Sequence, residues 1–144
     1  MLLTKMLKLR EEAILPTRAT PESAGWDLYL PTDLDRTQIV RSATIGLGIA
    51  LELPNKTVGQ VSIRSSVAKR GLIIVNSPGI IDCDYRGEIK LILRNLSTVP
   101  YQLVKGERLA QIVVLSLPEV AGYEVTELSN TYRGAGGLGS TGRS

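Results

Sequence analysis

The C-terminal residues 133–144 read RGAGGLGSTGRS and combine groups that bind anions. Arg133 supplies a guanidinium, Ser140 and Thr141 supply hydroxyls, and the glycines expose backbone N–H groups that can turn toward a negative ligand. Leu138 is the large apolar side chain of this stretch, so the segment cannot contribute a core. We expect a mobile arm that becomes ordered on a polyphosphate, with a disordered tail that binds no ligand as the alternative.

Two nucleotide-binding patterns match the same tail without their structural context. Residues 134–139 fit G-x-G-x-x-G, and residues 134–141 fit the spacing of a P-loop with Ser140 in place of the lysine. Both patterns need a helix after the loop, and the first needs a whole βαβ unit. Few residues follow here, so we reject both patterns.

Composition restricts the possible chemistry. Histidine is absent from the 144 residues, and Cys83 is the single cysteine. These counts exclude a Ser-His-Asp triad, a histidine zinc site, an internal disulfide and a cysteine zinc cluster. Proton transfer near neutral pH then falls to a carboxylate, with Cys83, a lysine or a tyrosine as the alternatives. Metal chemistry must use oxygen ligands, which favours Mg²⁺ over zinc.

Charge and length indicate the class of protein. The net charge of +3 is mild and no basic run is interleaved with aromatic residues, so we expect no nucleic-acid partner. The N-terminal residues MLLTKMLK are broken by lysines and predict neither a signal peptide nor a membrane span, so we expect an intracellular, cytoplasmic location and no membrane partner. We divide the chain into a β-barrel domain over residues 1–127 and a flexible arm over residues 128–144.

The spacing of apolar residues is typical of strands. Ile89, Leu91 and Leu93 alternate with mostly polar residues, and Val61 and Ile63 do the same. Further strands are indicated over residues 44–53, 72–75 and 109–117, and one helical turn over residues 65–69. Prolines and glycines interrupt the pattern at short intervals, so we predict an all-β barrel or sandwich.

Five segments concentrate the polar residues that can do chemistry. They are AGWDL at residues 24–28, RSS at 64–66, the turn-rich NSPGIIDCDYRGE at 76–88, GERLAQ at 106–111, and the tail. In this order and spacing, over about residues 24–142, the chain resembles the trimeric dUTPase family. Any one of these motifs occurs often by chance, but all five in the family's order form a specific signal.

The resemblance implies a jelly-roll-like subunit that hydrolyses dUTP to dUMP and pyrophosphate. Such a reaction keeps uracil out of DNA and supplies dUMP for thymidylate synthesis. Water would attack the α-phosphorus, and Asp82 matches the family's catalytic aspartate. Asp82 follows Ile80 and Ile81, where partial desolvation would raise its basicity. The alternative for Asp82 is a turn aspartate that caps backbone N–H groups.

The resemblance also implies which residues contact the base and the sugar. Asn76 would offer a donor and an acceptor to the uracil edge, and Tyr85 would lie under the deoxyribose, where its ring leaves no room for a 2′-hydroxyl. A half-buried strand tyrosine and a solvated strand lysine are the alternatives for Tyr85 and Lys90. The full set of implied contacts is Asn76, Gly79, Ile80, Ile81, Tyr85 and Lys90.

The triphosphate would be held by cationic and hydroxyl groups. Arg64 and Arg133 would neutralise charge, and Ser65, Ser66 and Gln111 would donate hydrogen bonds. The arm would close with Gly137, Leu138, Gly139, Ser140 and Thr141.

The resemblance further implies a magnesium ion and a homotrimer with shared active sites. Mg²⁺ would be held mainly by the phosphates and by water. Asp27 would act in its outer shell, through water or by orienting an arginine, and a capping aspartate at a strand start is the alternative. An extended chain from Glu127 to Arg133 spans on the order of 20 Å, enough to reach the pocket of a neighbouring subunit.

Two positions qualify the resemblance. Leu138 stands where relatives have an aromatic ring that stacks on uracil, which predicts a lid that opens faster. The RSS motif also occurs in dCTP deaminases of the same fold, but their catalytic glutamate aligns with Ile92, which cannot carry a proton. We therefore favour dUTP hydrolysis over deamination and keep a dUTPase-like binding or regulatory module with poor turnover as the other alternative.

Overall fold

The computed structural model describes residues 3–34 and 38–137, and its regular structure is almost entirely strand. The strands are β1 (Lys5–Lys8), β2 (Trp26–Tyr29), β3 (Gln38–Ile39), β4 (Ser42–Gly46), β5 (Ile49–Glu52), β6 (Thr57–Ile63), β7 (Leu72–Ile74), β8 (Gly79–Asp82), β9 (Lys90–Asn95), β10 (Tyr101–Gln102) and β11 (Arg108–Ser116). The helix found in the described part is one turn, α1 (Ser65–Ala68). The predicted all-β class and the short helical turn are confirmed.

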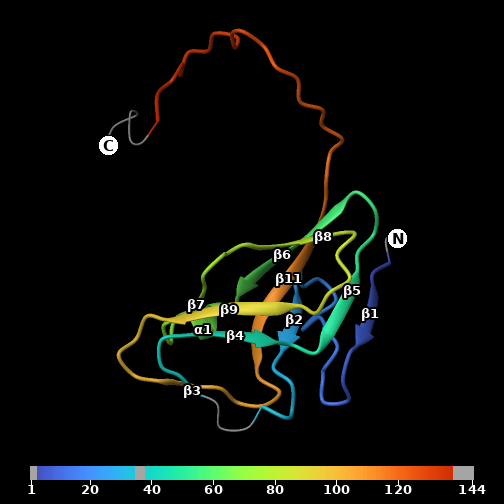
Figure 1. The fold of residues 1–144 in the computed structure, drawn as a ribbon, viewed down its shortest axis with the longest axis vertical. Helices are drawn as coiled ribbons and strands as arrows, with labels where there is room; N and C mark the ends of the chain where they lie inside the picture. Colours follow the sequence, from blue (N-terminus) through green and yellow to red (C-terminus); the bar gives the residue numbers. More distant parts are fainter. Residues whose placement is uncertain (1–2, 35–37, 138–144) are drawn as a thin grey trace.

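The strands form small antiparallel sheets that wrap around one core (Figure 1). The largest sheet has the order β2-β11-β6-β8, a second has the order β4-β9-β7, and the pairs β1-β5 and β10-β3 complete the body. Leu91 and Leu93 of β9 are buried and alternate with exposed neighbours, as predicted. Leu109 and Ile112 of β11 and Leu28 of β2 meet them in the same cluster of buried residues.

Two segments differ from the prediction. The apolar run over residues 44–53 is two strands, because Gly48 adopts a left-handed backbone conformation (φ 69°) that separates β4, which pairs with β9, from β5, which pairs with β1. The segment over residues 76–88 was predicted as turns, but Gly79–Asp82 pairs with β6 as β8. Val61 opposes Gly79 and Val58 opposes Asp82 in this register.

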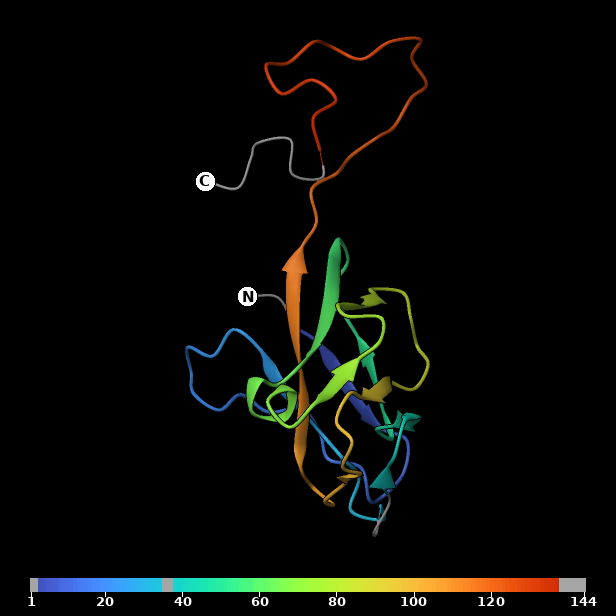
Figure 2. The same cartoon turned by 90° about the vertical axis from the view of Figure 1, so that its left-hand side faces the viewer.

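The chain leaves the body after β11. Residues 117–137 contain no strand or helix, and every residue from 117 to 135 is exposed. Figures 1 and 2 show this segment rising from the end of β11 and running well clear of the sheets. The domain boundary predicted at residues 127 and 128 therefore falls within this segment, which begins directly after the last strand at Ser116. No helix in the described ranges is long and apolar enough to span a membrane.

Candidate active site

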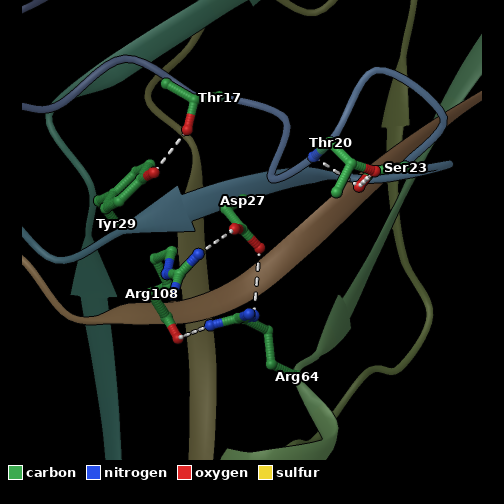
Figure 3. Close-up of polar contacts among 7 residues, drawn as sticks. All are labelled: Thr17, Thr20, Ser23, Asp27, Tyr29, Arg64 and Arg108. Carbon is green, nitrogen blue, oxygen red and sulfur yellow. Dashed lines mark hydrogen bonds and ion pairs between the residues drawn. The ribbon is translucent and has the colours of Figure 1, made fainter.

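Asp27 lies on β2, and its carboxylate is paired with arginines that follow β6 and begin β11. Oδ1 of Asp27 is 3.1 Å from Nε of Arg64, and Oδ2 accepts a hydrogen bond of 3.2 Å from Nη1 of Arg108 (Figure 3). Asp27 is 6% exposed, whereas the side chains of Arg64 and Arg108 are 28% and 45% exposed. The buried carboxylate is thus compensated on both oxygens, while the guanidinium groups reach solvent. We call these three residues the arginine cluster.

An irregularity in β11 brings the cluster together. Gln111 opposes Asp27 and Arg108 opposes Tyr29, with a register shift at Leu109. Residues that oppose each other across an antiparallel pair share a face, so Arg108 and Gln111 both lie on the face of Asp27. In a regular strand without a bulge, two residues three positions apart would lie on opposite faces. The bulge therefore lets one strand supply both a cation and an amide to the same site.

The other predicted phosphate-binding side chains of the body lie beside this cluster. Gln111 opposes Ser62 on β6, and its side chain packs on Gly25, where a Cβ atom would come within 2.8 Å of Oε1. Arg64 precedes α1, so the exposed Ser65 and Ser66 form the first turn of the helix next to the guanidinium. Arg64, Ser65, Ser66 and Gln111 are thus gathered at one end of the large sheet.

A network around the buried Tyr101 supports this end of the sheet. Oε1 of Glu107 accepts a hydrogen bond of 2.9 Å from the Tyr101 hydroxyl and is ion-paired with Arg70, whose guanidinium lies 4.5 Å from the centre of the Tyr101 ring. Burial raises the pKa of the Tyr101 hydroxyl well above its ordinary value, and the hydrogen bond and negative charge of Glu107 raise this pKa further. The network joins the segment after α1 to the residue before Arg108.

The predicted catalytic residue lies in a different place, on the segment that runs from β8 through a turn into β9, two strands that belong to different sheets. We call it the β8–β9 segment. A depression of about 210 Å³ is lined by Ile80, Ile81, Asp82, Tyr85, Glu88 and Lys90. Asp82 is exposed in this chain, so the desolvation expected from its apolar neighbours is not supplied by the chain itself. Asn76 lies at the approach to β8, where its amide nitrogen is 3.6 Å from the place that a Cβ on Gly79 would occupy. Ile80 is 52% exposed, and its neighbour Ile81 packs against the core.

The two groups of residues lie at opposite ends of one strand. Asp82 pairs with Val58 near the start of β6, whereas Arg64 follows the last residue of that strand. Val58, the partner of Asp82, is six residues before Arg64, and at about 3.3 Å per residue this puts Asp82 about 20 Å from Arg64 along the strand. One chain therefore does not bring Asp82 next to the arginine cluster.

The arm carries the remaining predicted residues. Arg133 is exposed, and its Nε donates a hydrogen bond of 3.0 Å to the carbonyl oxygen of Gly136 within the arm. Gly137 is also exposed. Leu138, Gly139, Ser140 and Thr141 lie outside the described residues.

The structure adds two residues that the sequence did not single out. Arg108 stands in the motif GERLAQ, but the bulge that turns it toward Asp27 has no signature in the sequence. Glu88 lines the depression and accepts a hydrogen bond from the backbone N–H of Gly48. The position of Glu88 shortly before an apolar strand is a weak signal in the sequence. Its partner Gly48 lies 40 residues away, so a local pattern does not reveal the hydrogen bond.

A metal would find few protein ligands in the body. In the described parts of the chain, no three His, Cys, Asp or Glu side chains gather in a way that could hold a metal ion. Asp27 is the carboxylate nearest to the predicted phosphate ligands, and both of its oxygens are engaged with arginines. This arrangement fits the orienting role considered for Asp27 better than direct metal ligation.

The fold and the site define an all-β enzyme with a cationic cluster and a carboxylate-bearing depression. The sequence profile of the dUTPase family matches residues 11–142, and the chain belongs to this family. The recognition made from the five motifs is confirmed.

Named relatives and solved structures agree with this assignment. The deoxyuridine 5′-triphosphate nucleotidohydrolase of Hydrogenobaculum sp. (strain Y04AAS1) is 47% identical over 136 residues, 94% of each chain. That of Corynebacterium jeikeium (strain K411) is 48% identical over 143 residues, covering 96% of this chain and 92% of the relative. The fold resembles that of the Staphylococcus bacteriophage 80alpha dUTPase with dUpNHpp, with a TM-score of 0.85, 24% identity and coverage of 98% and 99%. A variant dUTPase of S. aureus phage phi11, described with a structural Mg(II) ion, gives a TM-score of 0.79 at 22% identity, covering 89% of this chain and 99% of that one.

Proposed function

We propose that this chain hydrolyses dUTP to dUMP and pyrophosphate, with Asp82 as the general base. The observation that carries the proposal is that Asp82 and Tyr85 line one depression in a chain of the dUTPase family. Asp82 takes a proton from water, whose oxygen then forms a bond to the α-phosphorus. The bond from this phosphorus to its bridging oxygen breaks, and the electron pair leaves with pyrophosphate.

The base and the sugar occupy the depression beside the β8–β9 segment. Asn76 and the backbone near Gly79 read the uracil edge, and the exposed side chain of Ile80 covers the base. Tyr85 lies under the deoxyribose and excludes a 2′-hydroxyl, and Lys90 borders the same depression. A site that hydrogen-bonds its substrate rejects a mismatched polar pattern strongly.

The arginine cluster and the helical turn bind the triphosphate. Arg64 and Arg108 reach solvent while Asp27 keeps them fixed, so their charge is positioned before the substrate arrives. Ser65, Ser66 and Gln111 donate to phosphate oxygens. A bound Mg²⁺ would neutralise developing charge on the phosphates. Asp27 would contact this ion only through a water molecule.

The separation of the two groups favours a site shared between subunits. Because Asp82 lies about 20 Å from Arg64 along β6, one triphosphate bound at the arginine cluster is not adjacent to Asp82 of the same chain. In a homotrimer, Asp82 of one subunit lies beside the arginine cluster of another. The arm then reaches a site whose Asp82 belongs to a different chain. Arg133, Gly137, Leu138, Gly139, Ser140 and Thr141 then close over the nucleotide.

The test is a nucleotide panel of dUTP, dCTP, dTTP and UTP with Mg²⁺, scored for pyrophosphate. We expect release with dUTP and little with the other nucleotides. Asp82→Asn should lower the turnover number by about 10²- to 10⁴-fold, the range of a general base, while a nonhydrolysable deoxyuridine triphosphate still binds. Ammonia release from dCTP would support the deaminase alternative, and tight dUTP binding without pyrophosphate release would support the regulatory module.

A further inference from the structure

The Tyr85 ring is held in place by Gly87 and Glu88, in the turn shortly before β9. Its hydroxyl donates a hydrogen bond of 3.0 Å to the backbone carbonyl of Glu88. The ring lies across Gly87, where a Cβ atom would come within 2.5 Å of Cζ and 2.9 Å of Cε2. The position of the ring thus depends on the position of the peptide at Glu88.

The side chain of Glu88 is tied to a different part of the fold. Its Oε1 accepts a hydrogen bond of 2.8 Å from the backbone N–H of Gly48. Gly48 is buried, and the ladder passes it on both sides: Leu47 donates to the carbonyl of Ile89, and Ile89 donates to the carbonyl of Ile49. A buried N–H without an acceptor is costly, so the Glu88 carboxylate fills a specific gap in the sheet.

The carboxylate has space because residue 46 is glycine. A Cβ atom on Gly46 would lie 2.7 Å from both Cδ and Oε2 of Glu88. Gly46 is the last residue of β4 and opposes Lys90, the first residue of β9. Glu88 can therefore reach Gly48 because residue 46 has no Cβ atom.

We propose that Glu88 is a positioning residue that sets the sugar specificity of the site. This inference rests on the proposed function, in which Tyr85 excludes the 2′-hydroxyl. The Glu88 carboxylate fixes its own peptide against the β4–β5 turn, and the carbonyl of that peptide fixes the Tyr85 hydroxyl. If the carboxylate is lost, the peptide and the ring gain freedom, and the space beside the sugar widens.

The experiment compares kcat/KM for dUTP and for UTP in four single variants and one double variant. Glu88→Ala removes the acceptor, whereas Glu88→Gln keeps a carbonyl oxygen for Gly48 and serves as the conservative variant. Gly46→Ala leaves Glu88 intact but pushes its carboxylate away from Gly48, and the steric adjustment is small because that end of the side chain is flexible. Glu119→Ala, at an exposed ion pair with Lys56, is the matched control.

We expect Glu88→Ala and Gly46→Ala to lower the dUTP/UTP ratio by roughly tenfold or more, chiefly through faster use of UTP. Glu88→Gln and Glu119→Ala should keep the wild-type ratio. The double variant with Gly46→Ala and Glu88→Ala should lower the dUTP/UTP ratio no further than either single variant, because both changes remove the same hydrogen bond between Glu88 and Gly48. Circular dichroism and light scattering would verify that each variant folds and assembles, and Gly46→Ala decides the question if Glu88→Ala does not.

The outcomes separate the two proposals. A wild-type chain that prefers dUTP, with Glu88→Ala and Gly46→Ala keeping that preference, would overturn the role of Glu88 alone. A general fall in kcat for both nucleotides at an unchanged ratio would also overturn it, since that result indicates a merely structural contact. A wild-type chain that releases no pyrophosphate from dUTP would remove the proposed function and this inference together.

Discussion

The arginine cluster and the β8–β9 segment that carries Asp82 are built in different ways. The cluster consists of side chains from β2, the end of β6 and the start of β11, and the register of the large sheet fixes where they stand. The β8–β9 segment depends on the turn over residues 83–88, where Tyr85 and Glu88 make the positioning hydrogen bonds. The phosphate side is thus rigid by sheet geometry, while the base and sugar side depends on a few local contacts. Substitutions at residues that only position the reacting and phosphate-binding groups should therefore act on stability in the first region and on specificity in the second.

The largest expected effect tests whether the two regions of one site come from different chains. Asp82→Asn and Arg64→Ala should each be nearly inactive alone. When equal amounts of the two variants are unfolded together and reassembled, about a quarter of the wild-type activity should return, because random mixing in a symmetric oligomer leaves that fraction of shared sites intact. Pyrophosphate release before and after mixing is the measurement.

The control for this experiment is a mixture of the double variant with wild-type chain. Light scattering should report the same trimer in both mixtures. If the two single variants regain no activity although mixed trimers form, both groups act within one chain, and the 20 Å separation along β6 would have to be closed by a rearrangement.

A smaller effect is expected where the arginine cluster loses its buried anion. Asp27→Asn keeps the shape but leaves Arg64 and Arg108 facing each other without the carboxylate. We expect a loss of about 2 kcal/mol in the free energy of unfolding, below the range for fully buried pairs because both guanidinium groups reach solvent. Urea unfolding at one fixed protein concentration measures it.

Asp33→Asn is the matched substitution in an exposed pair. Asp33 lies 3.3 Å from Arg10, with side chains 41% and 39% exposed. This change should alter stability by less than about 1 kcal/mol. Equal losses in the two variants would mean that the Asp27 pair is no more than a surface contact, and the proposed rigidity of the cluster would be wrong.

The sequence predicted the regular strands better than it predicted the site. Alternation of Ile89, Leu91 and Leu93 was sufficient for β9, because one face of that strand is buried and the other is not. It was insufficient for β8, where Pro78 and Gly79 suggested turns although Gly79–Asp82 pairs fully with β6. Strand pairing depends on contacts distant in sequence, which local patterns do not contain.

The five motifs identified the family and collected most of the site residues, but they could not arrange them. The bulge at Leu109 turns Arg108 toward Asp27, and only the observed register reveals it. The separation of Asp82 from Arg64 likewise follows from pairing to opposite ends of β6. The role of Glu88 was not predicted because it depends on the backbone N–H of Gly48, which lies between β4 and β5, outside both strand ladders.

The smallest predicted effect concerns the network beneath the arginine cluster at high pH. Burial and Glu107 raise the pKa of Tyr101 in the folded state, so the folded chain keeps this proton where the unfolded chain loses it. Above the ordinary tyrosine pKa of about 10, the folded state binds more protons, and stability should fall by at most about 1.4 kcal/mol per pH unit from this group. Below that pH the contribution is fully present.

Tyr101→Phe should flatten this dependence, since phenylalanine has no proton to lose. Free energies of unfolding in urea between about pH 9 and pH 11 would measure the slope for wild type and variant. Tyr123→Phe, which changes a ring that is 87% exposed on the segment after β11, is the matched control. Parallel curves for wild type and Tyr101→Phe would mean that the bond to Glu107 opens at little cost, and the phosphate side would then resemble the β8–β9 segment in depending on loose local contacts rather than on a packed network.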